Sequence, residues 1–414
     1  MMLRRSTSRR AKALMAASVA VVLTCVVGCG SSSKSSSSPS TGTGGSSSGA
    51  AATGSPIKIG NIGSYTGATA TSNAPVRDAL IAWSKTVNAA GGINGHPVEI
   101  VVQDDKNDPA ASAQALRTLV ESDHVVAIAG VAAQGTDSTW DSYTKANNIP
   151  IVGGLQGAGT WYTNPMYFPL SSGTNIKAAA YLLGPKNGGA SKIFSFYCAE
   201  VSSCATTANQ EKAIASKLGV DFLGSVSVSA TSANYAAVCL QAKNAGANGV
   251  ANTLPQSSFL RVVQTCAQQG FTPIYSLNQG AITDEALALP QLEKSFVYRN
   301  AFPPDADAAA AFRTAMGKYA PDVNLANSQA QAGWAAGILL QTALKNISKT
   351  ANITSADVVN GLNSVTNDTL GGLLPQPVTF KAGAPHEPQT CLFTAHIINK
   401  KLVSDKDPLC SDVS

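Results

Sequence analysis

The sequence has few charged side chains, and they are unevenly placed. Only 13% of its 414 residues are Asp, Glu, Lys or Arg, whereas 44% are hydrophobic. The formal charge of +5 equals the number of basic residues in the first 28 positions, and this segment contains no acidic residue. The rest of the chain is therefore nearly neutral and lacks the basic footprint of a nucleic-acid-binding protein. We expect no nucleic-acid partner.

Motifs that mark common catalytic and metal sites are also absent. The sequence contains no G-x-x-x-x-G-K-[ST] loop, no H-E-x-x-H and no C-x-x-C pair, and its four His are scattered. Residues 63–67 read Gly-Ser-Tyr-Thr-Gly, so Tyr65 stands where a nucleophile elbow needs serine. His96 falls in a short hairpin and is expected to be exposed. We therefore expect no catalytic residue, no metal and no cofactor, although an enzyme stays an alternative.

One apolar run near the N-terminus indicates export. Residues 13–27 follow a basic stretch and fall short of the roughly 20 residues that span a bilayer. The run ends in Val26-Val27-Gly28-Cys29, which resembles a bacterial lipobox. The resemblance implies that residues 1–28 are a signal peptide and that Cys29 carries the lipid anchor, on the outer face of the cell membrane. An ordinary signal peptide would leave Cys29 unmodified. A weak twin-arginine resemblance at residues 8–10 leaves the export route open.

Six cysteines remain once the signal peptide and Cys29 are set aside. An even number of cysteines in an exported protein indicates disulfides, and six allow 15 connectivities. Closeness along the chain favours the pairs Cys198–Cys204, Cys239–Cys266 and Cys391–Cys410.

The composition then changes twice along the chain. Residues 29–55 are mostly Ser, Gly and Thr and predict a flexible tether, because they cannot bury enough apolar surface. From Pro56 onward, Val/Ile-rich strands alternate with helical patterns, which is typical of parallel sheets covered on both faces. The first series has strands near 57–62, 98–102, 125–131 and 150–152, with helices opened by Asn73 and Pro75, at 108–121 and at 136–147.

The same alternation restarts after residues 171–173. Strands are expected at 192–197, 224–229, 249–254, 273–277 and 295–300, with helices at 174–186, 204–217, 232–244 and 256–269. Helices at 305–319, 326–346 and 354–362 and strands at 378–380 and 392–403 follow. Ligands of open α/β sheets bind beyond the carboxyl ends of the strands, and interdomain clefts are favoured sites. Two such units in one exported chain therefore predict a two-lobed ligand-binding protein.

Particular segments identify a resemblance to a known family. Residues 88–99, Asn-Ala-Ala-Gly-Gly-Ile-Asn-Gly-His-Pro-Val-Glu, and residues 104–109, Asp-Asp-Lys-Asn-Asp-Pro, resemble the type 1 periplasmic binding proteins of the branched-chain amino-acid group. The resemblance implies two doubly wound, Rossmann-like α/β lobes joined by a three-segment hinge that closes around a ligand. Lobe 1 would combine 56–172 with 301–372, and lobe 2 would combine 173–300 with 373–414. Asp104 and Asp105 would fix the loop that follows them.

The resemblance also implies which loops hold the ligand. In lobe 1 it places a carboxylate site at Gln134 and Gly135, where a helix begins and free N–H groups favour an anion. A second loop holds Gly154, Leu155 and Gln156. Plain helix capping by Thr136 or Asp137, and an ordinary glycine-rich loop, are the alternatives. Tyr65 would pack on the ligand or in the core, and Trp161 and Tyr162 would line the cleft or cover lobe 1.

In lobe 2 the corresponding loops hold Ser202, Gln256 and Gln279, and here the sequence departs from the family. Family members that bind amino acids carry an acidic residue where this chain has Gln279. An uncharged amide cannot neutralise a buried ammonium, and burying an unpaired charge is costly. Either Glu200 replaces that acid, or the ligand is an amide, a polyol-like molecule or a carboxylate without an amine.

The function implied by the resemblance is capture of a small polar molecule for an ABC importer. We expect a monomer whose partners are the ligand, an ABC permease and, through the lipid, the membrane. A lipid-anchored sensor that signals through a partner protein is the alternative.

Overall fold

The computed structural model describes residues 52–157, 159–200, 202–299, 301–326, 329–348 and 352–413. The expected signal peptide, Cys29 and most of the expected tether lie outside the described residues. The side chains of Ser202, Gln256 and Gln279 are also outside what the structure describes, although their backbones are placed.

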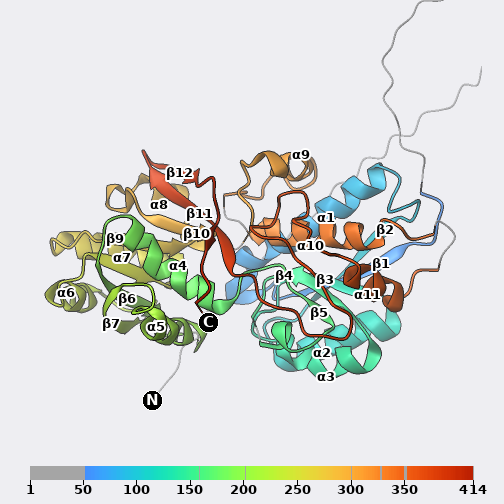
Figure 1. The fold of residues 1–414 in the computed structure, drawn as a ribbon, viewed down its shortest axis with the longest axis horizontal. Helices are drawn as coiled ribbons and strands as arrows, with labels where there is room; N and C mark the ends of the chain where they lie inside the picture. Colours follow the sequence, from blue (N-terminus) through green and yellow to red (C-terminus); the bar gives the residue numbers. More distant parts are fainter. Residues whose placement is uncertain are drawn as a thin grey trace, which may run out of the picture. The chain divides into compact units, whose positions relative to one another are not determined.

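A five-stranded parallel sheet forms the centre of the first lobe (Figure 1). Its strand order is β2-β1-β3-β4-β5, and helices cover both faces, as the Val/Ile-rich strands predict. The short strand β5 was not predicted. The strands are β1 (Ile57–Gly63), β2 (Val98–Asp104), β3 (Ala127–Val131), β4 (Ile151–Gly154) and β5 (Tyr167–Phe168), and the helices between them are α1 (Ala70–Ala89), α2 (Pro109–Arg117) and α3 (Asp141–Asn147).

Later helices complete the core of this first lobe. Helix α10 (Gln329–Leu344) packs against α1, β3 and β4, and α9 (Ala310–Tyr319) packs against α1 (Figure 1). Helix α11 (Ser355–Asn363) begins with a capping box formed by Thr354 and Asp357. The core continues through Leu373, Leu374, Val378 and Phe380. The chain therefore leaves this core later than the boundary expected at residue 372.

The second lobe is built on an eight-stranded sheet of order β12-β11-β10-β9-β8-β6-β7, with β13 paired to β11. Strands β6 to β10 are parallel, and β11 and β12 add antiparallel strands from the C-terminal part. The strands are β6 (Lys192–Cys198), β7 (Asp221–Val228), β8 (Gly249–Asn252), β9 (Ile274–Asn278), β10 (Phe296–Arg299), β11 (Cys391–Ile398), β12 (Lys401–Ser404) and β13 (Leu409–Cys410), and the helices are α4 (Thr174–Asn187), α5 (Ser202–Ile214), α6 (Ala236–Asn244), α7 (Gln256–Gln268) and α8 (Asp284–Ala288).

Three sequence expectations about elements were wrong. Helix α1 begins at Ala70, before Asn73, so Pro75 lies inside it, past the first turn. Because proline has no N–H, the hydrogen bond to the Thr71 carbonyl is missing from this helix. The helix expected at 136–147 opens as a 3₁₀ turn at 137–140 before α3. Residues 378–380 form no strand, because only Val378 pairs, with Asp368.

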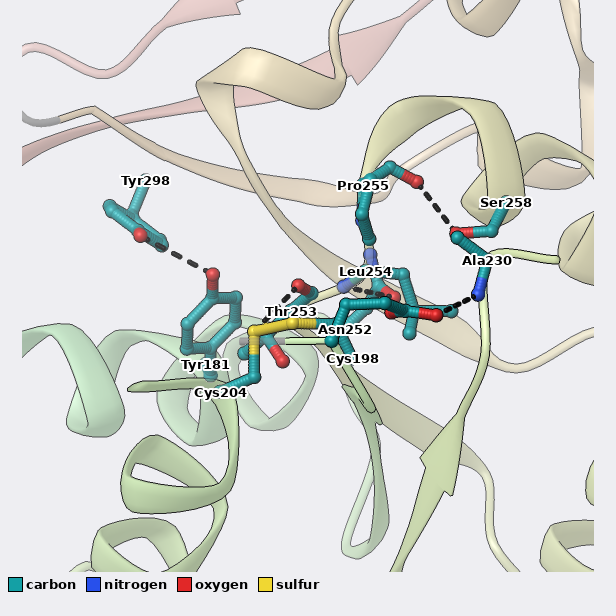
Figure 2. Close-up of a disulfide and its surroundings, with 11 residues drawn as sticks. Tyr181, Cys198, Cys204, Ala230, Asn252, Thr253, Leu254, Pro255, Ser258 and Tyr298 are labelled. Carbon is teal, nitrogen blue, oxygen red and sulfur yellow. Dashed lines mark hydrogen bonds between the residues drawn. A yellow bond between two sulfur atoms is a disulfide. The ribbon is translucent and has the colours of Figure 1, made fainter. Parts of the chain in front are cut away.

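The second lobe holds three disulfides. They join Cys198 to Cys204, Cys239 to Cys266 and Cys391 to Cys410, the pairs favoured by closeness along the chain. Figure 2 shows the first of them, which ties the end of β6 to the first turns of α5. The other two link α6 to α7 and β11 to β13.

Two segments that run between the sheets lie side by side. Ser172 pairs with Gln389 in a short parallel bridge, and the Ser172 hydroxyl donates to the Cys391 carbonyl at 2.7 Å. The Gln389 side chain donates to the Leu170 carbonyl at 3.0 Å. These bonds hold two crossing segments together. In the described part of the chain, no helix is both long and apolar enough to cross a membrane.

Candidate functional site

The first sheet reverses its strand order between β1 and β3, and this reversal marks where ligands bind in such sheets. The loops after these two strands meet there. Gly63 bridges to Ala132, and the Ser64 N–H donates to the Ala132 carbonyl at 3.0 Å. The predicted residues Tyr65, Gln134 and Gly135 therefore lie at a single edge of the sheet.

A buried carboxylate fixes the loops at this edge. Asp105 accepts hydrogen bonds from the Ser64 hydroxyl at 2.7 Å and from the Thr136 hydroxyl at 2.5 Å. It also accepts from the Asn107 N–H at 2.9 Å, so it orders its own loop as expected. Because Ser64, Asp105 and Thr136 follow β1, β2 and β3, the Asp105 carboxylate joins three loops. This residue was predicted to fix only one of them.

Tyr65 is part of the packing beside this edge. Its hydroxyl donates to Asn61 Oδ1 at 2.5 Å, and the Arg77 guanidinium lies 5.0 Å from the ring centre. Burial raises the pKa of the Tyr65 hydroxyl well above its ordinary value. Asn61 is itself held by donating to the carbonyls of Ala129 and Gly130. Tyr65 therefore has a defined role in packing, and it does not line the cavity described next.

A cavity of about 70 Å³ lies where residues of both lobes converge. It could hold several water molecules, since each needs roughly 10–15 Å³, but a larger ligand must widen it. Four of the predicted site residues line it together with four that were not predicted. The lining residues are Gln134, Gly154, Leu155, Gln156, Ser171, Lys177, Gln329 and Ala332.

Gln156 ties the loop after β4 to the first crossing segment. In the amide orientation that satisfies its neighbours, its oxygen accepts from the N–H groups of Leu170 (2.8 Å) and Ser171 (3.1 Å). Its nitrogen donates to the hydroxyls of Tyr162 (2.7 Å) and Ser171 (2.9 Å). Gln156 thus positions Ser171 in the cavity wall. Tyr162 stands behind Gln156 and lines a different pocket.

Lys177 is the one charged side chain among the lining residues that the structure describes. It lies near the start of α4 and is half-buried, and its removal from solvent lowers the pKa of its ammonium to about 8. The sequence could have indicated Lys177 as a candidate, because it is the only charged residue between Lys145 and Lys186.

Gln329 also lines the cavity, from the start of α10, and its buried Oε1 has no hydrogen-bond partner among the described residues.

The loop after β3 is exposed at Gln134 and Gly135 and becomes buried at Thr136 and Asp137. Thr136 makes no capping bond to the 3₁₀ turn, because its hydroxyl is bound to Asp105.

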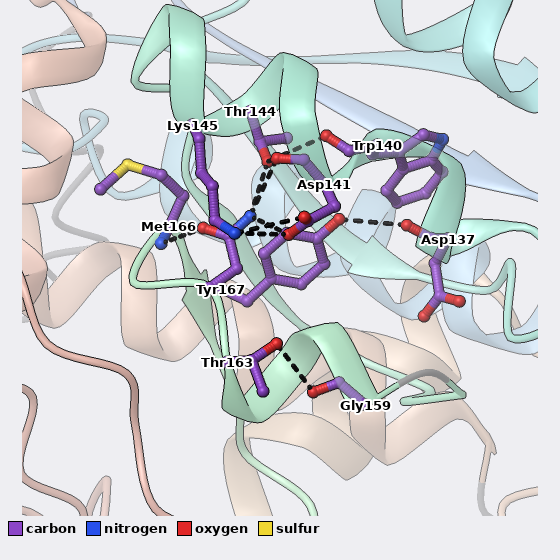
Figure 3. A network of polar contacts seen from close by, with 10 residues as sticks. Asp137, Trp140, Asp141, Thr144, Lys145, Gly159, Thr163, Met166 and Tyr167 are labelled. Carbon is purple, nitrogen blue, oxygen red and sulfur yellow. Dashed lines mark hydrogen bonds and ion pairs between the residues drawn. The ribbon is translucent and has the colours of Figure 1, made fainter.

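Asp137 holds two aromatic side chains of the first lobe. Its carboxylate accepts a hydrogen bond from the Trp161 indole N–H at 2.7 Å. Its backbone carbonyl accepts one from the Tyr167 hydroxyl at 3.1 Å (Figure 3). Trp161 is fully buried and therefore covers the first lobe instead of lining a cleft.

The second sheet reverses its order between β6 and β8 in the same way. Ser202 begins α5 after β6, Gln256 begins α7 after β8, and Gln279 begins a 3₁₀ turn after β9. Their backbones thus stand at the corresponding edge of the second sheet.

Glu200 is exposed, and its carboxylate accepts hydrogen bonds from the Ser229 hydroxyl at 2.8 Å and the Ala230 N–H at 2.7 Å. These bonds lower its pKa and hold it on the loop after β7.

A larger cavity, of about 480 Å³, lies beside the crossing segments, between the start of α4 and residues 387–390 and 411–413. None of its lining residues follows β3 directly. Because the smaller cavity is lined by the loops after both β3 and β4, we assign the ligand site to it. Among the described residues, no group of three or more His, Cys, Asp or Glu is arranged to hold a metal ion.

His96 was expected to be exposed but is fully buried. Its two ring nitrogens form hydrogen bonds with the backbone carbonyls of Ser55 and Ser348.

Comparison with known proteins agrees with this architecture. The periplasmic binding protein family matches residues 56–401. An amino acid binding protein of Pseudomonas aeruginosa is 30% identical over 99 residues, which cover 24% of this chain and only 26% of that relative. The chain therefore belongs to the periplasmic binding protein family, whose members bind ligands outside the cytoplasm.

Two solved structures share the fold. The solute binding protein of an ABC transporter from R. palustris, in complex with 4-hydroxybenzoate, has a TM-score of 0.67 at 16% identity, covering 86% of this chain and 98% of that one. The branched-chain amino acid transporter substrate binding protein LivJ from Streptococcus pneumoniae, in complex with isoleucine, has a TM-score of 0.68 at 15% identity, covering 86% of this chain and 100% of that one. The predicted two-lobed α/β fold is confirmed.

Proposed function

We propose that the protein is a lipid-anchored solute-binding protein that captures a small polar molecule between its lobes and delivers it to an ABC importer. The observation that carries the proposal is the convergence of the loop after β3, the loop after β4, α10 and α4 on one polar cavity. A ligand that contacts both lobes would stabilise the closed form by its differential affinity for that form. Both solved structures named above come from transporters, which favours delivery over signalling.

The anchor in this proposal is Cys29, at the end of the apolar run. The Ser/Gly-rich residues that follow it would act as a tether between membrane and lobes. A single acyl chain binds membranes only marginally, so stable anchoring requires more than one chain.

Ligand contacts would come from both sheet edges. In the first lobe we propose Gln134, Gly135, Gly154, Leu155 and Gln156; in the second we propose Ser202, Gln256 and Gln279. The ligand class that suits them is an amino acid, an amide or a small carboxylate.

A thermal-shift screen tests this function directly. The full chain, purified from membranes in detergent and refolded to remove carried-over ligand, is melted with amino acids, amides, carboxylates and polyols. A ligand that binds only the folded form raises the melting temperature by mass action. We expect at least one class to raise it, and Gln134→Ala and Gln279→Ala each to reduce that shift. Silence across the panel would contradict the proposal.

A further inference from the structure

We propose that Lys177 makes this site selective for a small carboxylate that carries no ammonium group. The inference rests on the proposed function, since it names the ligand class of the same cavity. It starts from the charge balance of the cavity wall.

Among the described residues, the cavity wall contains a cation and no anion that balances it. No described residue accepts a hydrogen bond from the Lys177 ammonium, and no described carboxylate forms an ion pair with it. The other polar lining groups are amides and a hydroxyl, from Gln134, Gln156, Gln329 and Ser171, and none of the described lining residues is acidic. Gln134, Gln329 and Ser171 can each donate a hydrogen bond to an anion, whereas the Gln156 amide nitrogen already donates to Tyr162 and Ser171.

The cost of burying the charge points to the missing partner. A charged group removed from water is unfavourable unless it is paired, and the lowered pKa of Lys177 reflects this cost. A carboxylate in the cavity would pair with the ammonium through a charge-assisted hydrogen bond, which is about twice as strong as a neutral one. The cavity wall therefore favours an anion.

A zwitterionic amino acid fits this wall poorly. Its ammonium would enter a site that already contains Lys177, and like charges in a low-dielectric site repel strongly. Glu200, the acid that could have neutralised an ammonium, is bound to the loop after β7 and does not line the cavity. Gln279 adds no charge either, being an amide.

Matched ligand pairs separate charge from shape. We would measure affinities by calorimetry for acetate and acetamide, butyrate and butyramide, and benzoate and benzamide, with leucine and isoleucine as zwitterions, in buffers without carboxylates. The full chain in detergent is used throughout. We expect one or more carboxylates to bind at least about 10-fold more tightly than the matching amide, the lower limit for a charge-assisted contact.

Two substitutions in one helix locate the effect. Lys177→Gln should weaken carboxylate binding by about 10- to 100-fold and leave amide binding nearly unchanged. Lys186→Gln is the matched control, because Lys186 is an exposed lysine of α4 that donates to the Leu218 carbonyl outside the cavity. This control should bind carboxylates like the wild type.

The pH dependence of carboxylate affinity is a second test, and it needs no variant at Lys177. Carboxylate affinity should be constant between pH 6 and about 7 and fall above pH 8, as the Lys177 ammonium loses its proton. Elements packed against α4 carry other titratable or charged groups, namely Glu211 and Lys212 on α5, Tyr275 on β9, Tyr298 and Arg299 on β10 and His396 on β11, and α4 itself carries Tyr181 and Lys186. Glu211→Gln should keep the profile, which excludes the one group whose pKa is also about 8.

The outcomes distinguish this inference from the function on which it rests. If amides or amino acids bind and carboxylates do not, or if Lys177→Gln leaves carboxylate affinity unchanged, the anion preference is overturned while solute binding stands. If no compound binds, both are overturned. Should Lys177→Gln fail to fold, an affinity that stays flat above pH 8 in the wild type would equally overturn the inference.

Discussion

Glu211 is a fully buried carboxyl on α5 that has no hydrogen-bond partner at either oxygen among the described residues. Burial raises its pKa from 4.5 to about 8. The unfolded chain releases this proton near pH 4.5, whereas the folded protein keeps it up to about pH 8. The unfolded state thus binds fewer protons in this interval, so the free energy of unfolding falls as the pH rises through it.

Glu211→Gln should remove this loss, because the amide has the same size and does not ionise. Relative to the wild type, the variant should gain about 3 kcal/mol in the free energy of unfolding between pH 4.5 and pH 7. Denaturant unfolding at the two pH values measures this difference. Glu285→Gln, at an exposed position of α8, is the control. An equal gain in both variants would show that burial of Glu211 is not the cause.

At this scale the sequence predicted part of the cavity wall but not its charged residue. Gln134, Gly154, Leu155 and Gln156 line the cavity and Gly135 does not; the four come together because strand ends in a parallel sheet must share an edge. Lys177, Ser171 and Gln329 were missed, since they come from a crossing segment and two helices that approach only in the folded molecule. His96 was misjudged because its partners, Ser55 and Ser348, are far from it in the sequence.

Among the elements, the contact between α1 and α10 is the closest packed. A Cβ atom placed on Gly333 would lie 2.0 Å from the Val76 carbonyl oxygen, and one on Gly337 would lie 2.3 Å from the Trp83 ring. Both glycines are on α10, so the two helices approach as closely as backbone atoms allow. This contact joins chain segments that are about 250 residues apart.

Gly333→Ala should therefore destabilise the first lobe by about 1–3 kcal/mol or more, because the obstructing atom is backbone and cannot rotate away. Gly317→Ala provides the comparison. It is also a helical glycine, on α9, but its Cβ would meet nothing within 4 Å, so about 0.5–1 kcal/mol of helix propensity should be gained. Melting curves of both variants check this, and a neutral Gly333→Ala would disprove the close contact.

Element types were predictable, and element boundaries were less so. Long periodic helices and Val/Ile-rich strands follow from local pattern, and most were correctly placed. Strand β5 has only two residues and depends on its pairing with β4, so no local pattern indicates it. Residues 378–380 show the opposite error, because this Val-Thr-Phe triplet resembles a strand, but Val378 and Phe380 only pack into the first core.

For the whole molecule, we expect ligand binding to draw the lobes together about the crossing segments. Ser172, Gln389 and Cys391 join two of these segments by hydrogen bonds, which would let them bend as a unit. Small-angle X-ray scattering should show a smaller radius of gyration when a bound ligand saturates the protein. An unchanged radius with a saturating ligand would contradict closure.

The order of segments along the chain has a further effect on how the protein folds. The first core cannot be completed until α10 and α11 have been synthesised, and the second sheet lacks β11 to β13 until the last residues emerge. Each lobe thus waits for a segment that follows much of the other, and such distant pairings carry a large loop-closure cost and slow folding. Neither lobe is built from one continuous segment, so we expect the two lobes to fold late and in close succession.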